Sequence, residues 1–199
     1  GRTIHDQVRP LPAMARFRQW WQAAAQGNVS QNIYTFNSPN TVWFNDGLGQ
    51  FSDSGQQLGQ MESMAVSLGD VNGDGFLDAV LGNNGADEVW LNDGQGNFRL
   101  GQRLGNGLTW SVYLADLDGD GDLDLVIGGE SHGRVWLNDG SGYFRRGQGF
   151  GYGRYQSIAV GDVTGEGIVD IFVAGVESYQ VWRGVGDGRF SAEPRTSYR

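Results

Sequence analysis

The sequence predicts an all-β protein made of four repeats of about 46 residues, and three observations support this prediction. An acidic loop recurs at a constant spacing, at residues 70–78 (DVNGDGFLD), 116–124 (DLDGDGDLD) and 162–170 (DVTGEGIVD). The composition, with 34 glycines and 12% aromatic residues, suits short strands joined by tight turns. A Val-Trp pair recurs at nearly the same step, with its tryptophan at Trp43, Trp90, Trp136 and Trp182.

One repeat, residues 60–106, predicts four strands. The first strand alternates apolar and polar residues, and the second is a short apolar run that follows the acidic loop. The third and fourth strands flank an Asn-Asp-Gly hairpin turn. In order, the predicted strands are Met64–Leu68, Leu77–Leu81, Glu88–Leu91 and Phe98–Leu104, with a further turn at 82–87. Four strands in about 46 residues match one blade of a β-propeller.

The other repeats follow the same plan, so the chain is expected to form one propeller domain over residues 15–199 after a leader, 1–14, that can serve as a closing strand. A closed four-bladed monomer is the favoured architecture, because the leader can pair with the last blade, whose final strand is interrupted by Pro194. Two chains completing an eight-bladed ring are the alternative, since an open stack exposes a blade face at each end. The approximate repeats are 15–59, 60–106, 107–152 and 153–199.

Composition and missing motifs exclude several classes of protein. The net charge of −9 argues against a nucleic-acid partner, which requires a basic face. No run of about 20 apolar residues exists to insert into a membrane, and the first 14 residues lack the pattern of a signal peptide. The chain has no cysteine, only two histidines and none of the common catalytic motifs, so no enzyme is predicted.

The spacing of the acidic loops predicts a cation site in each. Oxygen ligands at positions 1, 3 and 5 converge on one point, and the glycine at position 6 permits a sharp turn. A backbone carbonyl at position 7 and a carboxylate at position 9 complete an oxygen shell that suits Ca²⁺. The pattern is similar to the opening of an EF-hand loop, but strands flank it and position 12 is apolar. We therefore expect calcium to stabilise the fold rather than to catalyse a reaction.

The repeats resemble the FG-GAP and VCBS repeats of integrin-α-like β-propellers, a family with members in fungal lectins and bacterial surface proteins. The resemblance rests on residues 68–78, 114–124 and 160–170 and on the Asn-Asp-Gly-x-Gly-x-Phe turns at 92–98 and 138–144, and it covers roughly residues 40–190. It implies a calcium-binding propeller at the cell surface or outside the cell. This chain departs from it in having four repeats, where familiar members have seven blades.

By this resemblance, every acidic loop supplies a set of calcium ligands, although the third is expected to be weaker because Thr164 and the longer Glu166 replace aspartates. The implied side-chain ligands are Asp70, Asn72, Asp74 and Asp78, then Asp116, Asp118, Asp120 and Asp124, then Asp162, Thr164, Glu166 and Asp170. The implied backbone carbonyls are those of Phe76, Asp122 and Ile168.

A separate ligand site is expected where the residues of one repeat differ in type from those at the same positions of the other repeats. Trp110, Asn106 and Arg154 have no counterpart of the same type and lie near one mouth of the predicted ring. An aromatic ring beside amide and guanidinium groups suits a sugar. The sequence therefore favours a calcium-stabilised binding module for glycans or a protein surface, of lectin or adhesion type. A self-assembling structural unit and an accessory domain of a secreted enzyme remain open as alternatives.

Overall fold

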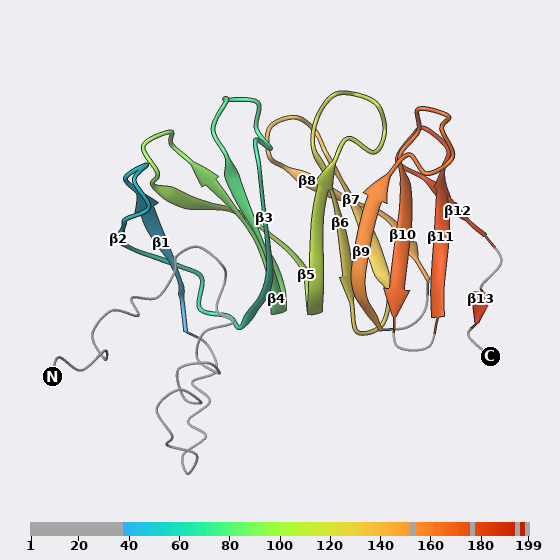
Figure 1. Cartoon of the computed structure of the whole chain (residues 1–199), viewed down its shortest axis with the longest axis horizontal. Helices are drawn as coiled ribbons and strands as arrows, with labels where there is room; N and C mark the ends of the chain where they lie inside the picture. Colours follow the sequence, from blue (N-terminus) through green and yellow to red (C-terminus); the bar gives the residue numbers. More distant parts are fainter. Residues whose placement is uncertain (1–37, 152–153, 176–177, 194–195, 198–199) are drawn as a thin grey trace, which may run out of the picture.

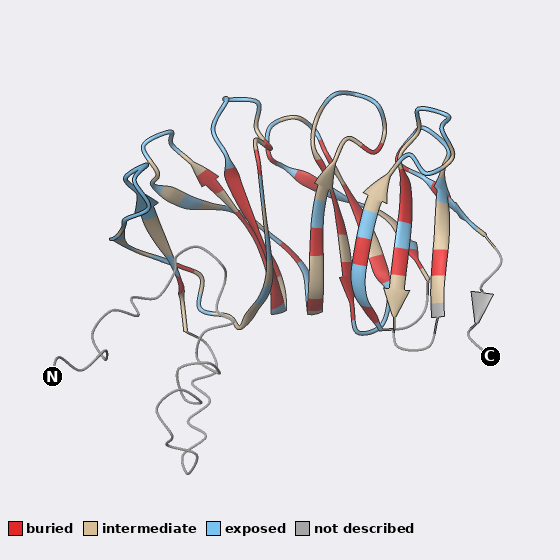
Figure 2. Cartoon of the chain, viewed as in Figure 1, coloured by how far each residue is buried: buried red, intermediate tan, exposed pale blue. Residues whose placement is uncertain are grey.

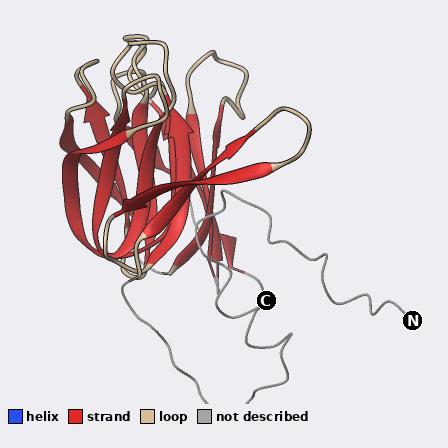
Figure 3. Cartoon of the chain, turned by 90° about the vertical axis from the view of Figure 1, so that its left-hand side faces the viewer, coloured by secondary structure: helices blue, strands red, loops and turns tan. Residues whose placement is uncertain are grey.

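The computed structural model describes residues 38–151, 154–175, 178–193 and 196–197. Within these residues the chain is all-β, with antiparallel strands and no helix, as the sequence predicts. The strands form four groups, which we call units one to four, standing side by side in an arc whose two ends lie far apart (Figure 1). Loops gather at the two ends of the strands (Figure 3).

The units follow the order of the sequence. Unit one contains β1 (Asn40–Asn45) and β2 (Phe51–Leu58). Unit two contains β3 (Ser63–Gly69), β4 (Asp78–Asn92) and the first part of β5 (Phe98–Ala115). Unit three contains the second part of β5, β6 (Asp124–Gly129), β7 (Gly133–Asn138) and β8 (Phe144–Phe150). Unit four contains β9 (Tyr155–Gly161), β10 (Asp170–Gly175), β11 (Ser178–Gly184), β12 (Phe190–Ala192) and β13 (Thr196–Ser197). Because β5 serves two units, units two and three form one six-stranded sheet.

Strands β4 and β5 are longer than predicted, because each continues through a bend between two predicted strands. In β4, Gly85 has a φ of 130° and the register with β5 shifts between Gly85 and Asp87. The Asp87 carboxylate accepts the backbone N–H of Asn83 at 2.9 Å across this bend. A glycine with positive φ lets the chain bend without leaving the ladder. The predicted break at 82–87 is therefore wrong, whereas in unit three the equivalent segment 130–132 does separate β6 from β7.

Two apolar clusters fill the spaces between neighbouring units, and the buried residues run along the inner parts of the sheets (Figure 2). One cluster joins units two and three and includes Val80 and Val112. The other joins units three and four and includes Val126 and Ile158. Val112 and Ile158 occupy the same repeat position on β5 and β9, so each inner strand turns this face toward the preceding unit.

The same repeat positions are exposed on two other strands, β3 in unit two and β10 in unit four. On β3, Val66 occupies the repeat position of Val112, yet it is exposed. On β10, Phe172 occupies the position of the fully buried Val126 but is 37% exposed. Its ring stacks on that of Tyr179, with 5.9 Å between the centroids. Units two and four thus each expose a side chain at a position that is buried between units elsewhere in the arc.

The repeated tryptophans differ in how far they are buried. Trp136 belongs to the buried cluster between units two and three. Trp182 is half-buried and packs against the cluster between units three and four. Trp43 and Trp90 are half-buried. The repeated tryptophan is therefore buried to a different extent in different units, although it occupies the same repeat position in each.

A glutamine on the outer strand of each of the first three units ties that unit to the next. The Gln102 side chain accepts the backbone N–H of Phe144 and donates to the carbonyl of the same residue, both at 2.8 Å. Gln148 makes the same two hydrogen bonds with Phe190. Gln56 accepts from Phe98 at 2.9 Å and donates to the carbonyl of Gly96 at 2.7 Å. These bridges recur at the step of the acidic loops and fix the spacing between units.

Replacing Gln102 by alanine should lower the free energy of unfolding by about 2 kcal/mol, because it removes two hydrogen bonds and leaves the Phe144 backbone without these partners. Denaturant unfolding monitored by tryptophan fluorescence measures this change. Gln57→Ala, at an exposed site on β2, is the matched control. Equal stability of the two variants would contradict the role of the bridge.

Several predictions concern residues outside the described part of the chain. They include the leader 1–14, the inner strands of the first repeat, and Pro194. On either side of Pro194 the last outer strand is short, since β12 has three residues and β13 has two. No helix in the described residues is long and apolar enough to cross a membrane.

Candidate functional site

The three acidic loops lie at the same end of the strands, along one edge of the arc, which we call the loop end. They connect β3 to β4, β5 to β6 and β9 to β10, at 70–77, 116–123 and 162–169. This end is the upper edge in Figure 1. Each loop follows the innermost strand of its unit, as the sequence predicts, so the antiparallel return of the next strand holds it in a tight turn.

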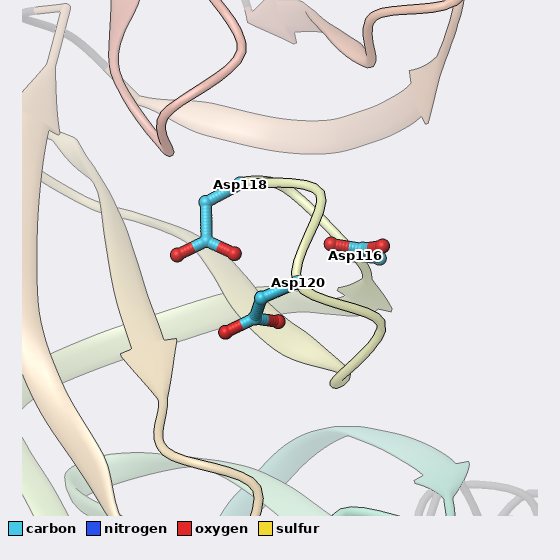
Figure 4. Close-up of side chains that lie close together, drawn as sticks. All are labelled: Asp116, Asp118 and Asp120. Carbon is cyan, nitrogen blue, oxygen red and sulfur yellow. The ribbon is translucent and has the colours of Figure 1, made fainter.

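The second loop brings three carboxylates together. Asp116, Asp118 and Asp120 each offer an oxygen within 4.8 Å of the others (Figure 4). Calcium holds its oxygen ligands at 2.3–2.6 Å, so two ligands of one ion lie no more than about 5 Å apart. The arrangement therefore fits the donor set of a calcium ion. Among the described residues it is the one group of three or more acidic, histidine or cysteine side chains with this spacing.

The electrostatics of the second loop also favour a cation. The Asp118 Oδ1 atom is buried and has no hydrogen-bond partner in the described part of the chain. Burial, followed by the charge of Asp120, raises the pKa of Asp118 above its ordinary value. Asp116 accepts the backbone N–H groups of Gly119 and Gly121 at 2.7 and 3.1 Å, which fixes its orientation. A bound divalent cation would supply Asp118 with a partner and reduce the repulsion between the carboxylates.

The first loop is satisfied more fully by its own groups. Both oxygens of Asp70 accept backbone N–H groups, from Asp74 at 3.2 Å and Gly75 at 2.8 Å. The Asn72 side-chain amide donates to Asp74 at 2.9 Å. Because Asn72 stands where the second loop has Asp118, the first loop has one carboxylate fewer among positions 1, 3 and 5 and less repulsion between negative charges there. Asp70, Asn72 and Asp74 still present side-chain oxygens in one turn, as the ligand prediction requires.

In the third loop the first aspartate accepts more backbone hydrogen bonds than the first aspartate of either other loop. Asp162 accepts the backbone N–H groups of Thr164, Gly165, Glu166 and Gly167 at 2.6–3.2 Å. These bonds, that of Gly167 foremost, lower the pKa of Asp162. The backbone stabilises this carboxylate without an ion, and the Glu166 side chain is exposed. These contacts agree with the expected weakness of the third site.

The ninth residue of each loop, an implied calcium ligand, also has a structural role. Asp124 is fully buried and accepts the backbone N–H of Leu117 at 2.9 Å and of Asn138 at 2.8 Å. Asp78 and Asp170 make the equivalent pair of hydrogen bonds in units two and four. Burial raises the pKa of Asp124 to about 6. These aspartates tie the loop to the third strand of the unit, and a carboxylate has lone pairs left for an ion.

A pocket of about 410 Å³ opens at the opposite end of the strands, along the other edge of the arc, which we call the turn end. It lies between units two and three, where β5 bends and where segment 130–132 joins β6 to β7. Polar and charged side chains line much of it, including Asp87, Asn106, Glu130, His132, Arg134 and Arg146. The acidic loops and the pocket therefore occupy opposite ends of the strands.

The structure brings two of the three predicted ligand residues to this pocket. Asn106 lines it directly. Arg154 forms an exposed ion pair with Glu130, a lining residue, at 3.2 Å. Trp110 is half-buried on β5 and does not belong to the lining, so its predicted role receives no support from this pocket. His132, in the segment that joins β6 to β7, is exposed and also lines the pocket.

Asp87 is a buried carboxylate at the inner wall of the pocket. It accepts hydrogen bonds from the Asn83 backbone and from Thr109 Oγ1, at 2.9 and 3.1 Å. Burial raises its pKa to about 6 despite these bonds. In the unfolded chain an aspartate titrates near pH 3.9, so the native state binds a proton more readily between about pH 4 and 6. Ionised Asp87 therefore lowers stability above that range.

Replacing Asp87 by asparagine should raise the free energy of unfolding by about 2 kcal/mol above pH 6.5 and by little below pH 4, where the wild-type carboxyl is protonated in both states. Asparagine keeps an acceptor for the Asn83 N–H, while its amide can donate to Thr109. Denaturant unfolding at several pH values measures the difference. Asp53→Asn, at an exposed site on β2, is the control. A gain independent of pH would contradict the explanation.

The model of the FG-GAP-like repeat matches three overlapping stretches of the sequence, residues 29–81, 70–127 and 116–173. Together they cover most of the chain and include all three acidic loops. A comparison with curated proteins gives no significant match.

Solved structures with a similar fold include a lectin of Agrocybe aegerita described as specifically recognising non-reducing terminal N-acetylglucosamine. The two chains share 25% identity with a TM-score of 0.53, over 81% of this chain and 46% of the lectin chain. The Tc holotoxin pore of Photorhabdus luminescens also matches, at 17% identity and a TM-score of 0.41, over 86% of this chain and 10% of the toxin chain. The chain thus spans less than half the length of the lectin.

Proposed function

The chain belongs to the FG-GAP-like repeat family, and from this premise we propose that it is a non-enzymatic, calcium-stabilised β-propeller module that binds a glycan or a protein surface. The observation that carries the proposal is the likeness to a glycan-binding lectin over 81% of the chain. The pocket at the turn end supports it, because a small-molecule site needs a concave region with a few convergent polar groups. Among the described residues, the one cluster of potential metal ligands consists of aspartates and contains no histidine.

Calcium has a structural task in this proposal. The second loop holds the strongest site, the first a second site and the third a weaker one, following the carboxylates and hydrogen bonds of each loop. The ion would fix the turn between the two inner strands of a unit. The same strands continue to the turn end, so a fixed turn would help to hold the pocket walls in place. Extracellular modules bind calcium with Kd of about 10⁻⁴ to 10⁻³ M. Such values suit the extracellular or cell-surface location that we propose.

Closure into a ring would cover the exposed apolar side chains of units two and four. Val66 in unit two and Phe172 in unit four occupy positions that are buried between units elsewhere. A ring completed by the first repeat of the same chain is the arrangement we propose, with a two-chain ring as the alternative. Light scattering distinguishes them, because one chain has a mass of 21.7 kDa. A mass twice as large would contradict the single-chain ring.

Self-assembly is the second candidate function, because the stacked rings of Phe172 and Tyr179 remain accessible in unit four. It predicts an association that depends on protein concentration and is lost in Phe172→Ser. The binding-module proposal predicts instead that recognition survives this change.

A glycan array tests the proposed function. Labelled protein in millimolar Ca²⁺ should bind a defined group of glycans, and excess of the best free glycan should displace it. If folded protein binds no glycan and a screen of surface proteins also yields no saturable partner, the proposal fails.

A further inference from the structure

The residue two positions before each repeated tryptophan differs between units in a way that changes the chemistry of the pocket. This residue is Thr41, Glu88, Arg134 and Gln180 in units one to four. In unit one, Thr41 Oγ1 accepts the indole N–H of Trp43 at 3.1 Å. In unit one, therefore, the residue at this position supplies a hydrogen-bond acceptor to the neighbouring tryptophan.

Unit two satisfies its charges internally. Glu88 is 1% exposed, and its Oε2 accepts the indole N–H of Trp90 at 3.1 Å. Its Oε1 pairs with the Arg103 guanidinium at 3.1 Å. One buried carboxylate thus neutralises an arginine and gives the tryptophan N–H an acceptor.

Unit three reverses the charge at this position. An arginine side chain has only donors, so Arg134 cannot accept the indole N–H of Trp136. That N–H is buried and has no partner among the described residues. Arg146 lies opposite Trp136 in the β7–β8 ladder and brings a second guanidinium. Within the described part of the chain, neither Arg134 nor Arg146 forms an ion pair with a carboxylate.

The surroundings of these arginines keep them unpaired. Arg134 donates to His132 Nε2 at 2.9 Å, which requires that nitrogen to be unprotonated. Burial and then the two arginines lower the pKa of His132, so the imidazole is neutral at pH 7. The two carboxylates of the pocket have other partners, since Glu130 pairs with Arg154 and Asp87 is held by hydrogen bonds. The pocket therefore offers two unneutralised guanidiniums.

We propose that this pocket binds an acidic sugar, with the guanidiniums of Arg134 and Arg146 holding its carboxylate or sulfate group. The sugar part of the ligand rests on the proposed function, whereas the preference for an anion rests on the charge reversal between Glu88 and Arg134. A ligand anion would provide unit three with the negative charge that Glu88 provides within unit two. Guanidinium groups suit carboxylate and sulfate because they can donate two parallel hydrogen bonds.

The size and setting of the pocket agree with such a ligand. Its volume of about 410 Å³ lies in the range of sites for small molecules, 300–1,000 Å³. Asn106, at the rim, offers donors and an acceptor for ring hydroxyls. The protein as a whole carries a net charge of −9, so the attraction is local and should weaken as salt screens it.

A matched pair of sugars tests the proposal on the intact chain. Methyl β-D-glucuronide and methyl β-D-glucoside differ in having a carboxylate or a hydroxymethyl group on the same ring. Calorimetric titration in low salt should show at least tenfold tighter binding of the glucuronide, with the difference reduced in high salt. Glucuronide bound no better than glucoside would overturn the proposal.

Variants locate the binding. Arg134→Gln should weaken glucuronide binding at least tenfold, whereas Arg145→Gln should leave it unchanged, because Arg145 is exposed on β8 and does not line the pocket. Arg134→Glu gives unit three the acceptor found in unit two, so it should abolish glucuronide binding without lowering the melting temperature. Loss of binding in Arg145→Gln, or full binding in Arg134→Glu, would place the anion elsewhere.

Further titrations distinguish failure of the acidic-sugar proposal from failure of the proposed function. Sodium acetate and sodium sulfate test for a simple anion site, and a short aspartate-rich peptide tests for a protein ligand. If either binds as tightly as the glucuronide, the sugar assignment is wrong. If neutral glycans bind on the array and acidic ones bind no better, this inference fails while the proposed function stands. If no saccharide binds, both fail.

Discussion

Replacing Asp120 by alanine should remove most of the stabilisation that calcium gives to this protein. Asp120 is one of three carboxylates that offer oxygens within 4.8 Å of one another in the second loop. A ligand at a hundredfold excess over its Kd stabilises the native state by about 2.7 kcal/mol. For a protein of this size that corresponds to a shift in melting temperature of about 5–10 °C. Thermal melts in millimolar Ca²⁺ and in EGTA measure the shift.

Glu166→Ala is the matched comparison, because it removes a carboxylate from position 5 of the third loop. Asp162 in that loop is already held by four backbone N–H groups, so the loop depends less on an ion. The difference between the Ca²⁺ and EGTA melts should be nearly that of the wild type in Glu166→Ala and much smaller in Asp120→Ala. The reverse order would contradict the ranking of the loops, and equal melts of the wild type in both buffers would contradict a calcium role.

Replacing Phe144 by alanine should have the largest effect on stability of any change considered. Phe144 is 1% exposed in the cluster between units two and three, and its backbone is held by Gln102. Truncating a buried phenylalanine typically costs about 3–5 kcal/mol, because the cavity collapses only partly. Phe44→Ala, at a site 42% exposed on β1, is the control and should cost much less. Denaturant unfolding of both variants measures the difference, and similar losses would contradict the packing between units.

The repeat pattern in the sequence predicts most of the described fold, because alternation, glycine turns and a constant spacing act locally. The four strands of unit three lie close to the positions that the pattern predicts. The continuity of β4 and β5 does not follow from these signals, since glycines such as Gly85 are typical of turns as well as of bends within a strand. A bend that keeps its ladder depends on pairing with a distant segment, which local patterns do not report.

The candidate site shows a similar division. The acidic loops can be recognised in the sequence because their carboxylates lie close together along the chain, and Asp116, Asp118 and Asp120 do converge. The pocket could not be read in this way, because its walls come from residues more than 40 positions apart, such as Asp87 and His132. One signal was present in the repeats and was missed: Arg134 stands where Glu88 stands one repeat earlier. The glutamines at 56, 102 and 148 carried a comparable signal for contacts between units.

We propose that the chain binds its ligand at the turn end, while calcium binds and stabilises the acidic loops at the loop end. An NMR titration distinguishes the two ends. Isotope-labelled protein in millimolar Ca²⁺ is titrated with the best glycan from the array, and amide shifts are followed by residue. We predict that the largest changes fall on segments 105–109 and 129–134, which line the pocket. Changes confined to the acidic loops at 70–78 and 116–124, or the absence of any saturable change, would contradict the account.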